Sequence, residues 1–366
     1  MVRVQVGPQK THSFEWVFYF FIKKGFMKIY LNIMLGLLFM PLVGFAQNGP
    51  FYFSHNNIQR EYYLHIPNNL PVNSPIVYVL HGWGSSGSDI MSTTAFNILS
   101  DQNNFAVCYP TALTGSSGMT EWDVSGFSDI DFIKALNDSL WGEHQLDLDR
   151  VFATGFSYGA EMCYHIANCQ TTDIFAAIAP LGGAMWDFIT NGWPIICTPS
   201  INISVFILNG TNDIEFNYNG GYYQGVGNYY PVDTTVSFWT NHNACIYNTN
   251  YNMPDINNDN FVTEVTKYNN INTGYKVWLY KVNNGIHEWF DVAPWGNDDF
   301  WASEEIWNFF SQVGNNTINS SYELISPNKK LIKIVDLLGR ETHLNPNTPL
   351  IYIYDDGTVE KKMYLE

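Results

Sequence analysis

The chain has 366 residues, of which 46% are hydrophobic and 16% are aromatic, enough to bury one sizeable core with a smaller appendage. Its 17 basic and 34 acidic residues give a formal net charge of -17. Such a charge repels phosphate backbones and anionic lipid surfaces, so we expect no nucleic-acid partner and favour neutral ones.

The first 46 residues have the pattern of a secretory signal peptide. Lys23, Lys24 and Lys28 precede an apolar run over residues 29–45. Small residues occupy the two positions that signal peptidase recognises, which predicts cleavage after Ala46. Translation would then start at Met27. The alternative is an uncleaved membrane anchor, but the run is short for a span and no basic stop follows it. We expect a secreted or cell-surface protein.

Short β-branched runs alternate with longer amphipathic ones from residue 51 onward. The alternation predicts an α/β fold, with a mostly parallel, doubly wound sheet covered by helices on both faces. The predicted strands cover residues 75–80, 105–109, 151–154, 175–179, 204–208 and 276–282, and the predicted helices cover residues 129–144, 232–242 and 302–310.

The composition changes after Val313. Residues 314–330 open with a polar, flexible stretch and form a predicted linker between a catalytic domain at 47–313 and a tail at 331–366. Strand patterns at 331–336 and 350–354, separated by turns, make the tail a small β-domain of its own.

A GxSxG motif at residues 155–159 lies between the strand ending at Thr154 and a helical run that begins near Ala160. The flanking glycines let the backbone turn sharply while the Ser157 hydroxyl projects above the sheet. That context predicts a nucleophile, against the alternative of a structural turn.

A serine nucleophile needs a histidine base, which a carboxylate must orient. Asp213 follows the strand at 204–208 through a glycine-containing turn, and His287 follows the strand at 276–282. Both stand in the order Ser, Asp, His that suits this fold. Either residue alone could be an ordinary loop residue, but together they predict a catalytic triad.

The loop at residues 81–84 ends the first buried strand and suits an oxyanion hole. We expect backbone N–H groups of Trp83 and Tyr158 to be the two donors, and His81 to be a structural histidine of that loop. Five tryptophans stand in loops near the predicted site, and any of them could stack on a substrate or pack in the core: Trp83, Trp122, Trp186, Trp289 and Trp295. We take Trp83 and Trp289 as candidate substrate contacts.

At this point the chain resembles the secreted esterases that include polyhydroxybutyrate depolymerases, feruloyl esterases and acetyl xylan esterases of carbohydrate esterase family 1. The resemblance implies an α/β-hydrolase with Ser157, Asp213 and His287 on the family's triad. The chain departs from the family pattern at Tyr158, where asparagine is common, and at Ile286, where glycine is common. The matching segments are Arg60-Glu61-Tyr62 before the first strand, residues 80–84, 149–160, 175–180, 209–213 and 285–289.

The five cysteines of an exported chain predict disulfides with one cysteine left over. Spacing alone does not fix the pairing, but the family resemblance implies Cys169 with Cys197. No zinc spacing is present, and we expect neither metal nor cofactor. Residues 255–259 begin like a calcium loop, yet Asn260 and Thr266 stand where glycine and glutamate are needed.

The tail resembles the C-terminal sorting domain of the type IX secretion system, notably over residues 334–340 and 354–362. This resemblance implies outer-membrane secretion machinery as a partner. A small β-sandwich or carbohydrate-binding appendage is the alternative.

Together these features predict a secreted serine esterase that acts on a polymeric ester substrate: polysaccharide-linked acetyl or feruloyl groups, or polyhydroxyalkanoate. A peptidase of the same fold and a noncatalytic surface-binding protein remain as alternatives. The sequence does not choose among the esters, because loop shape decides that.

Overall fold

The computed structural model describes residues 49–170, 174–187, 197–223, 226–255, 261–291 and 299–314, together with residues 331–335, 340, 342, 349–354 and 359–363 of the tail. The predicted signal peptide, the linker from residue 315 to 330 and most of the candidate calcium loop lie outside these residues. Within them, no helix has the length and apolarity that crossing a bilayer requires.

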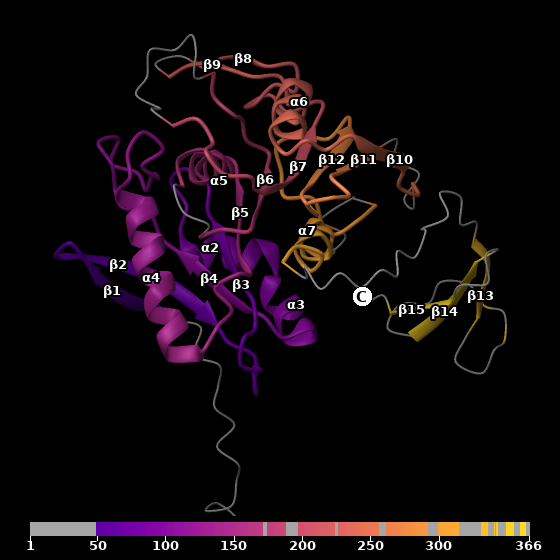
Figure 1. Cartoon of the computed structure of the whole chain (residues 1–366), viewed down its shortest axis with the longest axis horizontal. Coiled ribbons are helices and arrows are strands. Elements are labelled where there is room, and N and C mark those ends of the chain that lie inside the picture. The colour runs from indigo at the N-terminus through magenta and orange to yellow at the C-terminus, as the bar shows by residue number, and fades with distance from the viewer. Residues whose placement is uncertain are drawn as a thin grey trace, which may run out of the picture. The chain divides into compact units, whose positions relative to one another are not determined.

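A ten-stranded sheet forms the centre of the fold, in the order β1-β2-β4-β3-β5-β6-β7-β12-β11-β10 (Figure 1). The six strands in its middle pair in parallel. They are almost entirely buried, as expected of a parallel sheet covered on both faces. Their bounds are β4 Ala106–Pro110, β3 Ile76–Leu80, β5 Val151–Phe156, β6 Ala177–Leu181, β7 Ser204–Gly210 and β12 Lys276–Asn283.

Four antiparallel strands extend this sheet at its two edges, and the sequence patterns did not predict them. Their exposed positions and polar residues weaken the hydrophobic signal of a strand. Residues 60–62, which we expected before the first strand, lie inside one of them. The bounds are β1 Phe51–His55, β2 Ile58–His65, β10 Tyr247–Asn252 and β11 Val262–Asn269.

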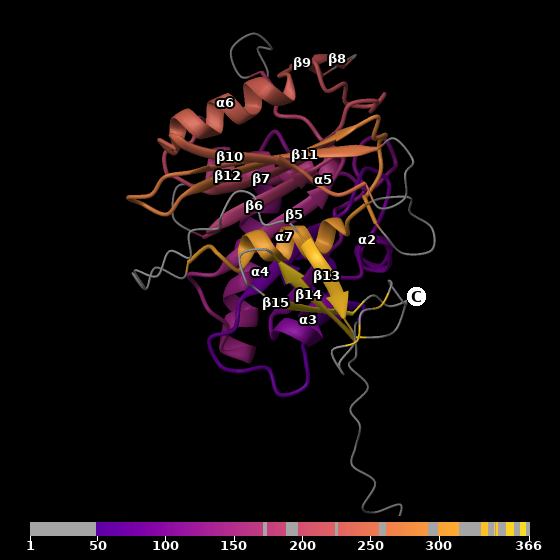
Figure 2. The ribbon, with the colours of Figure 1, turned by 90° about the vertical axis from the view of Figure 1, so that its right-hand side faces the viewer.

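Two hydrophobic clusters cover the two faces of the sheet, because successive side chains of each strand point to opposite sides. Tyr78 and Leu80 face a cluster shared with α4 (Ser128–His144), α5 (Tyr158–Cys169) and α6 (Val232–His242). Figure 2 shows α6 and α7 on opposite sides of the sheet. The second cluster takes Val77 and Val79 with α2 (Gly87–Thr94), α3 (Phe96–Asn103) and α7 (Ala302–Phe310). The doubly wound α/β fold is confirmed.

Two smaller sheets complete the described structure. Strands β8 (Gly221–Tyr223) and β9 (Gly227–Tyr229) form a hairpin. In the tail, β13 (Leu331–Val335), β14 (Pro349–Tyr354) and β15 (Val359–Met363) form an antiparallel sheet, with one strand more than the pattern predicted. The domain boundary at 313 stays a prediction.

A disulfide between Cys169 and Cys197 joins the end of α5 to the segment before β7, as the resemblance implied. The expectation of a single unpaired cysteine is wrong. Cys108, Cys163 and Cys245 are free and buried, and Cys108 and Cys163 pack in the core as small apolar side chains. Burial raises the pKa of both of these thiols, so they stay protonated and unreactive.

A buried ion pair fixes the edge strand β2 to α4. Arg60 Nη2 lies 2.5 Å from Asp129 Oδ1, and the guanidinium also stacks over the Phe132 ring at 3.8 Å. The second carboxylate oxygen accepts a hydrogen bond from the Asp123 backbone N–H at 2.7 Å. The pair therefore links β2, α4 and the loop that precedes α4.

We expect Arg60→Ala to lower the free energy of unfolding by about 3–5 kcal/mol, because it leaves the Asp129 carboxylate buried without its partner. Urea unfolding followed by tryptophan fluorescence measures this. Lys134→Ala is the control, since it removes an exposed ion pair with Asp138 on the same helix and should cost less than about 1 kcal/mol. Equal losses in the two variants would contradict the argument.

Candidate active site

The turn between β5 and α5 holds Ser157 in an uncommon backbone conformation, with φ 55° and ψ -118°. Non-glycine residues rarely occupy this region, which costs on the order of 1–3 kcal/mol. The turn is held by a hydrogen bond from the Ser157 N–H to the Leu181 carbonyl at the end of β6, 3.0 Å long. The strained residue is thus the one whose hydroxyl was expected to act as nucleophile.

The two glycines of the motif are required by close backbone packing. A Cβ on Gly159 would lie 2.1 Å from the carbonyl oxygen of Leu80, and one on Gly155 would lie 2.5 Å from the Gly159 backbone. Real Cβ atoms do not make such contacts. The glycines therefore let the start of α5 lie directly against the ends of β3 and β5, which sets the height of Ser157 above the sheet.

His287 and Asp213 come to Ser157 from two other strand ends. The His287 ring lies with Nε2 3.0 Å from Ser157 Oγ and Nδ1 2.8 Å from Asp213 Oδ2. A carboxylate only accepts hydrogen bonds, so Nδ1 carries the hydrogen and Nε2 is free to accept from the serine hydroxyl. The three predicted residues are therefore brought into one hydrogen-bonded row.

The two ends of that row differ in exposure. The Asp213 side chain is fully buried, and its Oδ1 accepts hydrogen bonds at 2.8 Å from the backbone N–H groups of Glu215 and Phe216. The His287 side chain keeps 18% of its surface exposed and packs beside the Phe156 ring. The carboxylate is thus fixed, while the imidazole can reach a bound molecule.

The loop after β3 passes against the nucleophile. A Cβ on Gly82 would lie 3.4 Å from Ser157 Cβ, so the neighbouring Trp83 is held close to the serine. Neither Trp83 N–H nor Tyr158 N–H donates a hydrogen bond to the described residues. Both residues line the cavity in front of Ser157. Two unpaired amides at this place are what an oxyanion requires.

His81 is a structural histidine, as expected. Its Nε2 accepts a hydrogen bond from the Ala112 N–H at 3.0 Å, so Nδ1 carries the hydrogen and donates to the Gly82 carbonyl at 2.7 Å. Burial lowers the pKa of the His81 imidazole, which keeps it neutral. The ring thereby fixes the loop that carries Trp83.

A cavity of about 780 Å³ opens in front of Ser157 and is mostly apolar and aromatic. Trp83 is 54% exposed, so its face is available to a ligand. Trp289 also lines the cavity but is 7% exposed, and its Nε1 donates to Ser303. Trp122 is buried and donates to the His81 carbonyl, while Trp295 lies outside the described residues. The remaining aromatic lining residues are Phe156, Tyr158, Trp186, Phe216 and Tyr223.

Three carboxylic acids of the cavity wall were not singled out from the sequence: Glu121, Glu161 and Glu215. Glu161 carried a usable signal, because it is the single acidic residue in the otherwise mostly apolar helix α5. Its burial raises its pKa to about 8, although a hydrogen bond from Trp186 opposes the shift. Glu121 and Glu215 lie in loops, where acidic residues are common and carry no such signal.

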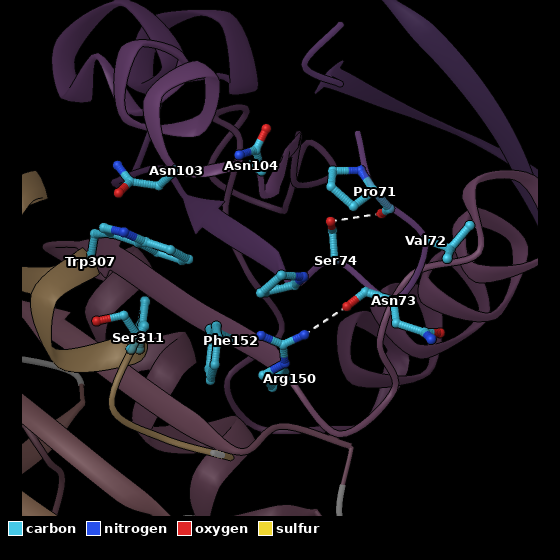
Figure 3. Close-up of a pocket in the computed structure, with 12 residues that line it drawn as sticks. Pro71, Val72, Asn73, Ser74, Asn103, Asn104, Arg150, Phe152, Trp307 and Ser311 are labelled. Carbon is cyan, nitrogen blue, oxygen red and sulfur yellow. Dashed lines mark hydrogen bonds between the residues drawn. The ribbon is translucent and has the colours of Figure 1, made fainter. Parts of the chain in front are cut away.

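A second cavity, of about 370 Å³, lies at the other end of the strands. Arg150 and Pro75 line it, and they directly precede β5 and β3. Figure 3 shows the Arg150 guanidinium pointing to the Asn73 carbonyl and the Ser74 hydroxyl to the Pro71 carbonyl. These polar groups are satisfied within the protein, and no histidine lies among the lining residues. The cavity at Ser157 is therefore the candidate active site.

No cluster of three or more metal-ligating side chains occurs in the part of the chain that the structure describes. Asp255 is the one described member of the candidate calcium loop, and residues 256–259 lie outside the described residues.

We expect Gly159→Ala to destabilise the protein by about 3 kcal/mol or more and to abolish activity, because the added Cβ collides with the Leu80 carbonyl. Gly142→Ala is the matched control. It lies inside α4 with open space around it, so it should stabilise by about 0.5–1 kcal/mol. Thermal unfolding of both variants checks this, and a Gly159→Ala protein as stable as wild type would refute the packing argument.

Comparison with known proteins places these residues in context. Residues 60–189, which include Trp83 and Ser157, match the family model described as "Esterase PHB depolymerase". The chain is 33% identical over 159 residues to the bifunctional acetylxylan esterase/xylanase XynS20E of Neocallimastix patriciarum, covering 43% of this chain and 22% of that protein. It is 29% identical over 146 residues to poly(3-hydroxyalkanoate) depolymerase C of Paucimonas lemoignei, covering 38% of this chain and 35% of that protein.

The chain thus spans well under two thirds of the length of these curated relatives. Among solved structures, an acetyl xylan esterase from Aspergillus awamori superposes with a TM-score of 0.50 at 17% identity, covering 72% of this chain and 98% of that one. At that identity the likeness concerns the fold, which is that of the α/β-hydrolases.

Proposed function

We propose that this protein is a serine esterase that hydrolyses carboxylic esters through an acyl-enzyme. The observation that carries the proposal is the row from Ser157 Oγ through the His287 ring to Asp213, with distances of 3.0 and 2.8 Å. A cavity large enough for an organic substrate opens at the serine end of the row.

In the first half of the reaction, His287 Nε2 takes the hydroxyl proton while Ser157 Oγ attacks the ester carbonyl carbon. The carbonyl oxygen becomes negative and is stabilised by the N–H groups of Trp83 and Tyr158. Asp213 stabilises the imidazolium, which then protonates the leaving alcohol as the carbon–oxygen bond breaks. Water repeats these steps on the acyl-enzyme, releases the acid and restores the serine.

For the substrate, we propose an ester carried by a polymer: acetyl or feruloyl groups on a polysaccharide, or polyhydroxyalkanoate. The names of the relatives, an acetylxylan esterase/xylanase and a poly(3-hydroxyalkanoate) depolymerase, support this range. The exposed face of Trp83 beside the cavity suits a flat sugar or aromatic ring. Acid release from the three polymers, measured side by side, distinguishes among them.

A peptidase is the second candidate, because the same triad can cleave amides. Short peptides assayed beside aryl esters separate the two, and we expect only the esters to turn over. A noncatalytic binding protein is the third, and covalent labelling of Ser157 by a fluorophosphonate would exclude it.

We also propose that the protein is exported, with a signal peptide at 1–46 removed and the tail at 331–366 recognised by outer-membrane secretion machinery. The basic and apolar pattern of the leader and the two tail motifs support this. Mass spectrometry of the mature N-terminus and the location of a chain lacking 331–366 test the two parts.

Ser157→Ala should lower kcat/KM on para-nitrophenyl acetate by about 10⁴-fold or more, because the attacking oxygen is lost. Fluorophosphonate labelling should disappear with it. Ser139→Ala, which removes a hydroxyl on α4 that donates to Glu143, should keep wild-type rates. Wild-type activity in Ser157→Ala would refute the proposal.

Asp213→Asn should lower kcat by about 10⁴-fold while the fold is kept. The asparagine oxygen would accept the two backbone hydrogen bonds, so its NH₂ group would face His287. That NH₂ donates to Nδ1 and leaves the ring hydrogen on Nε2, where it cannot accept the serine proton. Steady-state rates together with circular dichroism measure the effect. A loss of less than tenfold would show that Asp213 does not orient the imidazole.

A further inference from the structure

Glu161 lies one helical turn below the proposed nucleophile. Its backbone N–H donates to the Ser157 carbonyl at 3.2 Å, so the two residues share one face at the start of α5. The residue is 2% exposed and is one of those that line the same cavity as Ser157. The mechanism described above makes no use of it.

The two oxygens of this carboxyl have different surroundings. Oε2 accepts a hydrogen bond of 2.8 Å from Trp186 Nε1. Oε1 has no hydrogen-bond partner among the described residues, but this atom is not completely buried. One oxygen is therefore fixed by the protein, and the other is left for whatever occupies the cavity.

The surroundings of Glu161 favour its neutral form. Burial without a neighbouring cation disfavours a carboxylate and raises the pKa of Glu161 to about 8. Because Oε2 accepts the Trp186 hydrogen, the carboxylic acid proton belongs on Oε1. The other titratable groups among the described residues that line this cavity are Glu121, Tyr158, Glu215, Tyr223 and His287, and none of them is a lysine or arginine.

We propose that Glu161 is a specificity-determining residue whose Oε1–H donates a hydrogen bond to an uncharged oxygen of the substrate. The inference rests on the proposed esterase function and adds to it the kind of group that the cavity selects. The site would favour an ester with an ether, carbonyl or hydroxyl oxygen at this position over one with a methylene group there.

An uncharged oxygen fits this cavity better than an ion. Three carboxylic acids line the described wall, so an anionic group would be repelled by any that are ionised. A cation would be matched at Glu161 only by the ionised form, which burial disfavours. An alkyl chain would leave the Oε1–H without a partner once it displaced water, which costs affinity.

The test uses two pairs of esters that differ by one ether oxygen in place of a methylene group. Para-nitrophenyl 3-methoxypropanoate and para-nitrophenyl pentanoate place the change in the acyl part. Tetrahydropyran-4-yl acetate and cyclohexyl acetate place it in the alcohol part. The measured quantity is the ratio of kcat/KM within each pair, so that intrinsic reactivity cancels when variants are compared with wild type.

Glu161→Met keeps the side-chain volume but loses the hydrogen-bond donor. In one of the two pairs it should lower the ratio of kcat/KM for the ether ester to kcat/KM for the methylene ester by about 3- to 10-fold. The pair that responds identifies the part of the substrate that Glu161 contacts. Glu161→Gln keeps a donor, since its amide oxygen can accept from Trp186 while its NH₂ faces the cavity, and it should keep the ratio within twofold of wild type. Met162→Leu, on the core side of the same helix, is the control and should leave both ratios unchanged.

The pH dependence gives a second measurement that does not require the Met variant to fold. Glu161 holds its proton below its raised pKa and loses it above, so the wild-type preference for the ether should fall as the pH rises through about 8. In Glu161→Gln the ratio should not change over this range. A pH effect on the hydrolysis step itself is common to both members of a pair and cancels in the ratio.

Unchanged ratios in Glu161→Met for both pairs, or a wild-type ratio that does not vary between pH 7 and 9, would overturn the proposal. Failure of the esterase function itself is a different result, because no ester of either pair would then be hydrolysed by the wild-type protein.

Discussion

The site depends on one constraint: parallel strands present their carboxyl ends at the same edge of a sheet. Ser157, Asp213 and His287 follow β5, β7 and β12, and the parallel pairing from β5 through β6 and β7 to β12 puts those ends in one row. Tight backbone contacts then set the distances. A Cβ on Gly210 would lie 2.2 Å from the Gly285 carbonyl, so the loops carrying the acid and the histidine meet without space between them.

The same edge has two different electrostatic environments. Asp213 is buried, and its carboxylate accepts two backbone hydrogen bonds and one from His287. Glu161, one turn below the serine, accepts a single hydrogen bond from the described residues, and its burial raises its pKa to about 8. The two carboxyl groups at this edge thus have different surroundings, and the neutral form of Glu161, which burial favours, can act as a donor.

Much of the central fold could be predicted because its signals are local. The buried strands are continuous apolar runs, so the predicted strand at 204–208 lies within β7, and the helix at 129–144 differs from α4 by one residue. The edge strands β1, β2, β10 and β11 were not predicted because few of their positions are fully buried, so they lack the continuous apolar run of a central strand. The cysteine count was misleading for a similar reason: Cys108 and Cys163 behave as apolar core residues, which no spacing rule distinguishes from disulfide partners.

The parallel sheet and the GxSxG turn at residues 155–159 could be predicted from the amino-acid pattern alone, as could Asp213 and His287 as candidate site residues, because these signals lie in neighbouring residues. Which groups share the cavity depends on how the chain folds. All three of Trp83, Glu161 and Trp289 line the cavity. Trp289 is mostly buried there, whereas Trp83 is exposed, and Glu161 has one carboxyl oxygen without a partner among the described residues. The reason is that the burial and the hydrogen bonds of a side chain depend on residues from other parts of the chain. Glu161 and Trp186, for example, follow β5 and β6 and meet because these two strands pair.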